Sequence, residues 1–390
     1  VRGGWVPSAT LQVEADGGDD REDQTAADGI SSAQLQSALC PPDAIVRQPA
    51  SIQEEIDLQA ENWSCEWGSK LTSIKEPDWP ADLGEMPPML LADSLIQAGL
   101  SFKRGLGLGW DGIHPRMLAR ISPFLLRWIA CIMLISERSG NWDPAVGITV
   151  IVLLPKGDGT YRPVGLIPWM PKVWMRARKI DATNEERVNS AAWIDAGVGK
   201  GADIAAWKQA ARAELADLVQ WKAGYAQALL DLVKAFDHVP YWLLVREAIL
   251  LGFPLWLLRL SIATYQLPRV IRVGKYYSEI VVALRDITAG SGLATTEILL
   301  CMLNIIKRAM SVARSIIPTL FVDDVSAECT GPRKTVAREL GKLIKSIADD
   351  IAASGMELSK KKSVFTANSD KTGKELEETW QDLGIKYRKY

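Results

Sequence analysis

The stretch PTLFVDDVSAE at Pro318–Glu328 decides the fold of this chain. Residues that favour β-structure stand on both sides of its two aspartates, which predicts a tight hairpin with Asp323 and Asp324 at the tip. A second stretch, ALLDLVKAFD, ends at Asp237 and lies about ninety residues upstream. Together they offer separated carboxylates, the pattern that a metal-dependent phosphoryl transfer requires.

The Asp-Asp pair carries little weight by itself, because composition alone predicts about one in a chain of this length. Three occur, at Asp19-Asp20, Asp323-Asp324 and Asp349-Asp350. The first lies in an acidic leader and the third in a predicted helix, where a solvent-exposed surface is the simpler interpretation. The middle pair differs because strand-like residues flank it on both sides.

The second stretch places Asp231 at the end of a short buried strand, Ala226–Leu230. Pro240 then begins a predicted helix that stops at Gly252. If this strand and the hairpin are neighbours in one sheet, Asp231 and Asp323 converge on one point. That point would hold two Mg²⁺ ions, since hard cations seek carboxylate and phosphate oxygens.

A third stretch, Val152–Val164, has two strand-like arms around the turn Gly157-Asp158-Gly159. Each arm carries one cation, Lys156 in the first and Arg162 in the second. Such a hairpin can fold over a triphosphate, and an ordinary solvent-exposed hairpin tip is the alternative.

The order of these segments resembles that in the reverse transcriptases, of the type found in non-LTR retrotransposons and group II introns. The likeness covers roughly residues 105–390 and begins with GWDGIH at Gly109–His114, which is similar to a fingers motif of the family. It implies an α+β right-hand fold with fingers and a palm, the palm being a small, mostly antiparallel sheet backed by helices. The residues from 226 onward predict a matching order of strand, helix pair, hairpin, helix, hairpin, helix and strand.

The resemblance implies an RNA-directed DNA polymerase that adds deoxynucleotides to a primer 3′-hydroxyl, as part of a retrotransposon polyprotein. Asp231 and Asp323, helped by the main-chain carbonyl of Leu232, would hold two Mg²⁺ ions, or Mn²⁺ in their place. Asp324 is the weaker ligand of this set. The implied partners are an RNA template, a DNA or RNA primer and deoxynucleoside triphosphates.

The same resemblance assigns further residues to the nucleotide. Lys156 and Arg162 would contact its phosphates, Arg162 through a forked contact. Phe236 would lie beneath the sugar and exclude a 2′-hydroxyl, with a core-packing aromatic as the alternative. Lys362 would neutralise or protonate the departing pyrophosphate, with a basic surface run as the alternative.

Gly290 matches the glycine of a turn that leads into a long helix in the family. Many members carry Pro-Gln-Gly and then Ser-Pro, whereas this chain has Thr288-Ala289-Gly290 and then Ala294-Thr295. Gly290 keeps the close backbone approach that a glycine permits, so it is assigned to the nucleotide site. The missing glutamine bears on template contacts and fidelity, and it leaves the metal site untouched.

The family's helical thumb would follow the palm, but the sequence ends at Tyr390 without a counterpart, so we expect the thumb to be missing. Upstream, Trp63 and Trp67 lie four residues apart on one helical face, where a packing role is expected. The sequence therefore divides into a disordered acidic leader at 1–50, a linker with a helix at 51–84, fingers at 85–225 and a palm at 226–390.

The composition permits this reading. With 390 residues, 48% of them hydrophobic, the chain can bury a large core in more than one structural unit. The net charge of -2 is unevenly spread: residues 1–62 hold twelve acidic and three basic side chains, a charge of -9, which leaves +7 on the rest. A net positive charge on the remaining residues suits a protein that binds the phosphate backbone of a nucleic acid.

Five cysteines without paired spacing and only two histidines argue against a zinc site. The odd cysteine count and the absence of a secretory leader favour a reducing compartment, the cytoplasm or nucleus. No apolar run reaches the length of a membrane span, so a membrane partner is not expected. The sequence gives no indication of the oligomeric state.

Two other functional classes remain open. One is a catalytically inactive or truncated reverse transcriptase-like domain that only binds RNA or a partner. The other is an unrelated metal-dependent hydrolase with separated carboxylates, which would have to match the ordered segments by chance.

Overall fold

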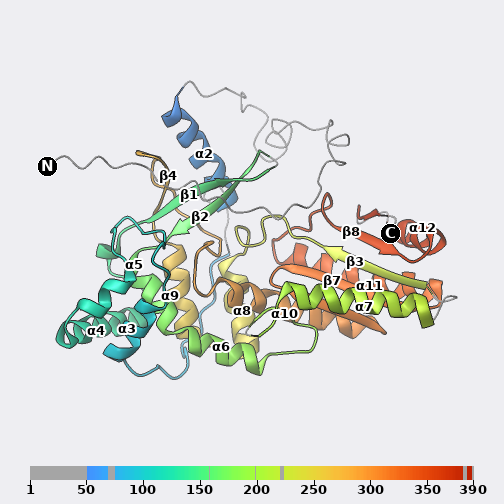
Figure 1. The fold of residues 1–390 in the computed structure, drawn as a ribbon, viewed down its shortest axis with the longest axis horizontal. Coiled ribbons are helices and arrows are strands. Elements are labelled where there is room, and N and C mark those ends of the chain that lie inside the picture. Colours follow the sequence, from blue (N-terminus) through green and yellow to red (C-terminus); the bar gives the residue numbers. More distant parts are fainter. Residues whose placement is uncertain are drawn as a thin grey trace.

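The computed structural model describes residues 51–388 apart from 69–74, 158, 198, 220–223 and 381–383, so the predicted leader at 1–50 lies outside the described residues. The chain is a mixed α+β protein in which helices surround two small mixed sheets (Figure 1). The α+β class predicted from the sequence is therefore confirmed. None of the described helices combines the length and the apolar character that a bilayer crossing requires.

The elements that precede the second stretch form the N-terminal half. They are α2 (Ile52–Glu66), α3 (Ala92–Leu100), η1 (Pro115–Arg120), α4 (Pro123–Ser139), η2 (Pro144–Val146), β1 (Thr149–Pro155), β2 (Tyr161–Leu166), α5 (Trp169–Ala177), α6 (Lys179–Val188) and α7 (Ala202–Val219).

The C-terminal half begins with the predicted order of strand, helix pair, hairpin, helix, hairpin, helix and strand, and one further helix and strand follow it. Its elements are β3 (Gly224–Leu230), α8 (Tyr241–Leu251), α9 (Leu255–Tyr265), β4 (Arg269–Val273), β5 (Tyr276–Tyr277), α10 (Ala294–Val312), β6 (Ile316–Phe321), β7 (Asp324–Gly331), α11 (Arg333–Ala353), β8 (Val364–Ala367), α12 (Asp370–Thr379) and β9 (Lys386–Tyr387).

Helix α8 begins and ends where the sequence predicted. Pro240 is its N-cap, because proline presets the backbone for a helix start and lacks the N–H that would be left unpaired. Gly252 is its C-cap with a φ of 71°, a left-handed conformation that glycine adopts at little cost. The helix therefore leaves the end of β3 at a fixed point.

The five-stranded sheet has the order β6-β7-β3-β8-β9. Strand β3 lies at its centre and runs antiparallel to both neighbours, β7 and β8. Strands β6 and β7 form the predicted hairpin, and β8 pairs with β9 in parallel. The strand that ends before Asp231 and the hairpin that carries the two aspartates are thus neighbours in one sheet, which meets the condition set for their carboxylates to converge.

The two faces of this sheet are covered differently because successive side chains of a strand point to opposite faces. Ala228 and Leu230 of β3 face the main core, and α11 packs against β3 and β7 on that side. Gln227 points to the opposite face, where its side chain donates to Gln209 of α7 over 2.8 Å. Helix α7 therefore flanks the sheet on the side away from the core (Figure 1).

The second sheet has the order β2-β1-β4-β5. Strands β1 and β2 form the hairpin predicted around 157–159, and residue 158 of its turn lies outside the described residues. Strand β4 pairs with β1 in parallel, from Thr149 with Arg269 onward. The β4–β5 hairpin falls in the range predicted as palm, yet it completes a sheet that begins in the range predicted as fingers.

Helix α2 packs on this second sheet. Its Trp63 and the following Trp67 are 6% and 1% exposed, with ring centroids 5.5 Å apart. They belong to a separate small core with Ile151 and Ile271. The predicted packing role of the two tryptophans is confirmed, and α2 is fixed to the folded body.

Candidate functional site

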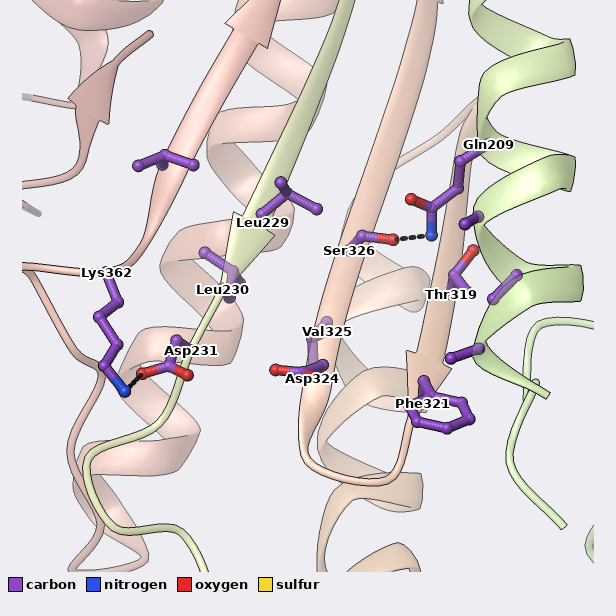
Figure 2. A pocket seen from close by; sticks show the side chains of 14 residues that line it. Gln209, Leu229, Leu230, Asp231, Thr319, Phe321, Asp324, Val325, Ser326 and Lys362 are labelled. Atoms are coloured by element: carbon purple, nitrogen blue, oxygen red, sulfur yellow. Dashed lines mark hydrogen bonds and ion pairs between the residues drawn. The ribbon is translucent and has the colours of Figure 1, made fainter. Parts of the chain in front are cut away.

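The register of β3 and β7 brings two of the predicted carboxylates together. Leu230 is paired with Val325, so Asp231, one residue on, stands opposite Asp324 at the same end of the sheet. Both side chains lie on the face that carries Leu229 and Ser326, not on the core face (Figure 2). The antiparallel ladder thus positions this carboxylate pair.

The hairpin turn differs in detail from the prediction. Phe321 pairs with Asp324, so the two loop residues are Val322 and Asp323, and Asp324 is the first residue of β7. Val322 has a φ of 60°, which is costly for a β-branched residue. The strained residue thus directly precedes the two aspartates, Asp323 in the loop and Asp324 at the start of β7.

Both aspartates of the hairpin lie in an environment that resists their ionisation. Burial and then the charge of Asp324 raise the pKa of Asp323 above its ordinary value. Burial and then the charge of Asp231 raise the pKa of Asp324, against the opposing charge of Lys362. A concentration of negative charge of this kind favours a bound cation.

Lys362 approaches Asp231 from the far side of β3. Its Nζ lies 3.5 Å from Asp231 Oδ2, while two-thirds of its side chain remains exposed (Figure 2). The geometry is that of an ion pair, and Oδ2 has no hydrogen-bond partner among the described residues although the atom is buried. Lys362 lies in the turn before β8.

The backbone around Asp231 is held by the segment that precedes β8. Ser359 N donates to Asp231 O over 2.8 Å, and Ser363 Oγ accepts from Asp231 N over 3.1 Å. Leu232 forms a bridge with Leu358. The assignment of the Leu232 carbonyl to a metal ion stays a prediction.

A pocket of about 380 Å³ opens between the carboxylate pair and α7. Its floor is the sheet face described above, and its wall is the first half of α7 (Figure 2). Gln209 closes one side by donating to Ser326 Oγ over 2.8 Å. The volume is in the range of small-ligand sites. The pocket is lined by Ala202, Ala205, Ala206, Gln209, Leu229, Leu230, Asp231, Thr319, Phe321, Asp324, Val325, Ser326, Lys362 and Val364.

The two predicted phosphate-binding cations do not belong to this pocket. Lys156 and Arg162 are exposed at the end of the β1–β2 hairpin and are absent from the pocket lining. Arg162 is paired across the hairpin with Leu154, one position from the turn. Their assignment to the nucleotide therefore stays a prediction.

Phe236 lies in the turn after β3 and Gly290 in the segment before α10, and these two segments are hydrogen-bonded to each other. The half-buried Phe236 packs against the main core, and its carbonyl accepts from Ile287 N over 2.8 Å. Gly290 has a φ of 112°, and a Cβ there would lie 2.5 Å from Gly165 O of β2. Gly290 thus approaches the backbone of the β1–β2 hairpin closely, and its assignment to the nucleotide stays a prediction.

The carboxylates of the site suit a cation that is also bound by waters and by substrate phosphates. No three histidine, cysteine, aspartate or glutamate side chains in the described ranges lie close enough to hold an ion by themselves. Mg²⁺ rarely needs such a cage, because it keeps several waters and binds through one or two carboxylates plus substrate phosphates. Asp231 and Asp324 fit that mode of binding, and the buried Oδ2 of Asp231 has the ion pair with Lys362 but no hydrogen bond among the described residues.

Two features of the site were missed at the level of sequence. Helix α7 was assigned no chemistry, yet it forms the pocket wall. The small residues Ala202, Ala205 and Ala206 at helical spacing were the available signal, since they let a sheet face approach. The second feature is Glu66, which contacts Lys234 and His238 in the turn after Asp231.

A scan against protein-family models and a search of curated proteins found no match to this chain.

Proposed function

We propose that the chain is an RNA-directed DNA polymerase of the reverse transcriptase type, which transfers a deoxynucleotide to a primer 3′-hydroxyl. The observation that carries the proposal is the register that sets Asp231 opposite Asp324, both of which line the pocket. The element order from β3 to β8 supports it, because it is the order that the resemblance implies. An intracellular site of action, in the cytoplasm or nucleus, goes with this function.

In this proposal the carboxylates Asp231, Asp323 and Asp324 and the Leu232 carbonyl hold two Mg²⁺ ions. When bound, such ions lower the pKa of the primer hydroxyl and neutralise charge on the nucleotide phosphates. The raised pKa values of Asp323 and Asp324 follow from burial and mutual repulsion, and a cation relieves both effects.

Lys362 serves the leaving group in this scheme. Its exposed ammonium group is tethered to the site by the ion pair with Asp231, so it can move toward charge that develops on a departing pyrophosphate. Lys156 and Arg162 would reach the phosphates from the β1–β2 hairpin. Phe236 would lie beneath the sugar and exclude a 2′-hydroxyl.

The test is primer extension on an RNA template with deoxynucleotides, with and without Mg²⁺. The chain as given is compared with a version that carries a thumb domain from a reverse transcriptase. We expect Mg²⁺-dependent extension that Asp231→Asn abolishes without a change in thermal unfolding.

Extension that survives Asp231→Asn, or that needs no divalent cation, would overturn the polymerase proposal. RNA binding without extension in either version would favour the inactive domain that only binds RNA. Hydrolysis of nucleotides without transfer to a primer would favour the hydrolase.

A further inference from the structure

The end of α2 contacts the turn that follows Asp231. Glu66 Oε1 lies 2.6 Å from Lys234 Nζ, and Glu66 Oε2 lies 2.6 Å from His238 Nε2. One carboxylate thus joins two side chains of the same short turn, at positions far from α2 in the sequence. Lys234 needs such support, because its φ of 44° is unfavourable for a residue other than glycine.

The surroundings of Glu66 favour its charged form. Burial would raise the pKa of Glu66, but the hydrogen bond with His238 and the charge of Lys234 outweigh it and lower the pKa to about 2. Lys234 Nζ also lies over the ring of Trp63, 4.8 Å from its centroid. The turn is therefore held by charge and by packing.

The residue after Glu66 holds the same turn and a second segment. Trp67 Nε1 donates to Asp237 Oδ1 over 3.2 Å. Its carbonyl accepts from Leu284 N and Arg285 N, over 2.9 and 3.2 Å. The ring of Trp67 also packs on the guanidinium of Arg269, with the carbon of that group 4.5 Å from the ring centroid.

These two segments carry the proposed sugar site between them. The turn Leu232–His238 includes Phe236, and the segment Leu284–Gly290 includes the glycine turn. They meet directly through the bonds from Ile287 N to Phe236 O and from Asp286 N to Val239 O, over 2.8 and 3.0 Å. The end of α2 therefore contacts both segments to which the proposed sugar site is assigned.

We infer that the end of α2 is a positioning element for this site, in which Glu66 and Trp67 set the place of Phe236 relative to the Ile287–Gly290 turn and so govern sugar selection. The inference rests on the proposed polymerase function. Glu66 and Trp67 do not touch the nucleotide in this scheme, and they act through Lys234, His238 and Asp237. A displacement of about 1 Å at a reacting group can cost roughly a hundredfold in rate, so loss of this support should be measurable.

The experiment compares Glu66→Gln and Glu66→Ala with Asp57→Asn. Asp57 is the matched control, an exposed carboxylate on the same helix that accepts only from Gln53 among its described contacts. Trp67→Phe is a further variant, because it removes the bond to Asp237 and keeps an aromatic ring near Arg269. Two quantities are measured on the full chain: hydrogen–deuterium exchange of the amides at 232–239, and the preference for deoxynucleotides over ribonucleotides.

We expect faster exchange at 232–239 in both Glu66 variants and in Trp67→Phe, with exchange in α11 unchanged. The preference for deoxynucleotides should fall about tenfold, which is part of the roughly hundredfold that misplacement can cost. Phe236→Ala supplies the full loss for comparison. Asp57→Asn should match the unaltered chain in both measurements.

The outcomes separate this inference from the proposed function. If the unaltered chain extends primers and the Glu66 variants keep full sugar preference, the inference is wrong and the polymerase stands. If the unaltered chain does not extend primers, the proposed function and the role in sugar selection both fail. Unchanged exchange at 232–239 in Glu66→Ala and Trp67→Phe would show that α2 does not hold the turn at all.

Discussion

Asp231 and Asp324 face each other across neighbouring antiparallel strands, one just after the end of β3 and the other at the start of β7. The ladder fixes this relationship through its last pair, Leu230 with Val325. Lys362 then approaches Asp231 from the opposite side, at 3.5 Å. The site is a line of charges across three adjacent chain segments, with the positive charge at one end.

Neutralising any one of the three carboxylates should strongly slow transfer. Asp231→Asn, Asp323→Asn and Asp324→Asn are each expected to lower the rate of nucleotide incorporation by about a hundredfold or more, because each removes charge that the cations need. Asp349→Asn is the control, since it changes an exposed aspartate of another Asp-Asp pair on α11. Single-turnover primer extension measures the rates, and a normal rate in Asp323→Asn would contradict the assignment of that residue.

Lys362 should act on the chemical step. We expect Lys362→Met to lower the single-turnover rate by about a hundredfold, the range of general acid catalysis, while the KM for the nucleotide changes little. Lys361→Met should have no effect, because that neighbouring lysine is exposed and outside the pocket. Equal losses in the two variants would instead indicate general attraction of the nucleic acid by a basic surface.

Gly290 should tolerate no side chain. Alanine there would combine a φ of 112° with a Cβ 2.5 Å from Gly165 O, so Gly290→Ala should lower the free energy of unfolding by more than the roughly 1–3 kcal/mol of backbone strain alone. Gly274→Ala separates the two effects, since Gly274 also has a positive φ but has nothing within 4 Å of its Cβ position. Denaturant unfolding measures both, and equal losses would mean that the contact with β2 yields easily.

Glu297 of α10 should make stability depend on pH. Its side chain is fully buried beside Tyr265, which donates a hydrogen bond to it, and burial raises the pKa of Glu297 to about 7 from an ordinary value of 4.5. As the pH rises, the unfolded chain therefore loses the Glu297 proton at a lower pH than the folded chain does. The stability that the protonated form provides is complete below about pH 4.5 and falls by up to about 3 kcal/mol as the pH rises to 7.

The variant Glu297→Gln isolates this effect, because glutamine keeps an oxygen for Tyr265 and cannot ionise. The difference in unfolding free energy between the two chains should favour the variant at pH 8 relative to pH 5. Denaturant unfolding at both values gives the result. A difference independent of pH would show that Glu297 has an ordinary pKa in the folded protein.

Local patterns in the sequence predicted the elements well and their long-range partners poorly. Pro240 and Gly252 bound α8 as expected, since both act through their own backbone preferences. The turn at Val322 was placed one residue late, because a valine with positive φ gives no local signal. The neighbouring aspartates looked like the better turn residues.

In the candidate site too, contacts between segments far apart in the sequence were harder to predict than local structure. The strand and the hairpin are neighbours, which was the condition for convergence, but the residue opposite Asp231 is Asp324, whereas Asp323 was expected and lies in the loop. The ion pairs of Glu66 with Lys234 and His238 were not expected, because they join segments far apart in sequence and no periodicity marks them. The wall formed by α7 was missed for the same reason, since its alanines look like ordinary helix formers.

The parallel pairing of β1 with β4 has a consequence for synthesis of the chain. Thr149 leaves the ribosome long before its partner Arg269, and the whole β3 strand is made in between. Until β4 arrives, β1 is an edge strand whose backbone groups are open to other nascent chains. Expression of fragments that stop between β2 and β4 should therefore give insoluble protein, and slower translation of this interval would lengthen the exposure.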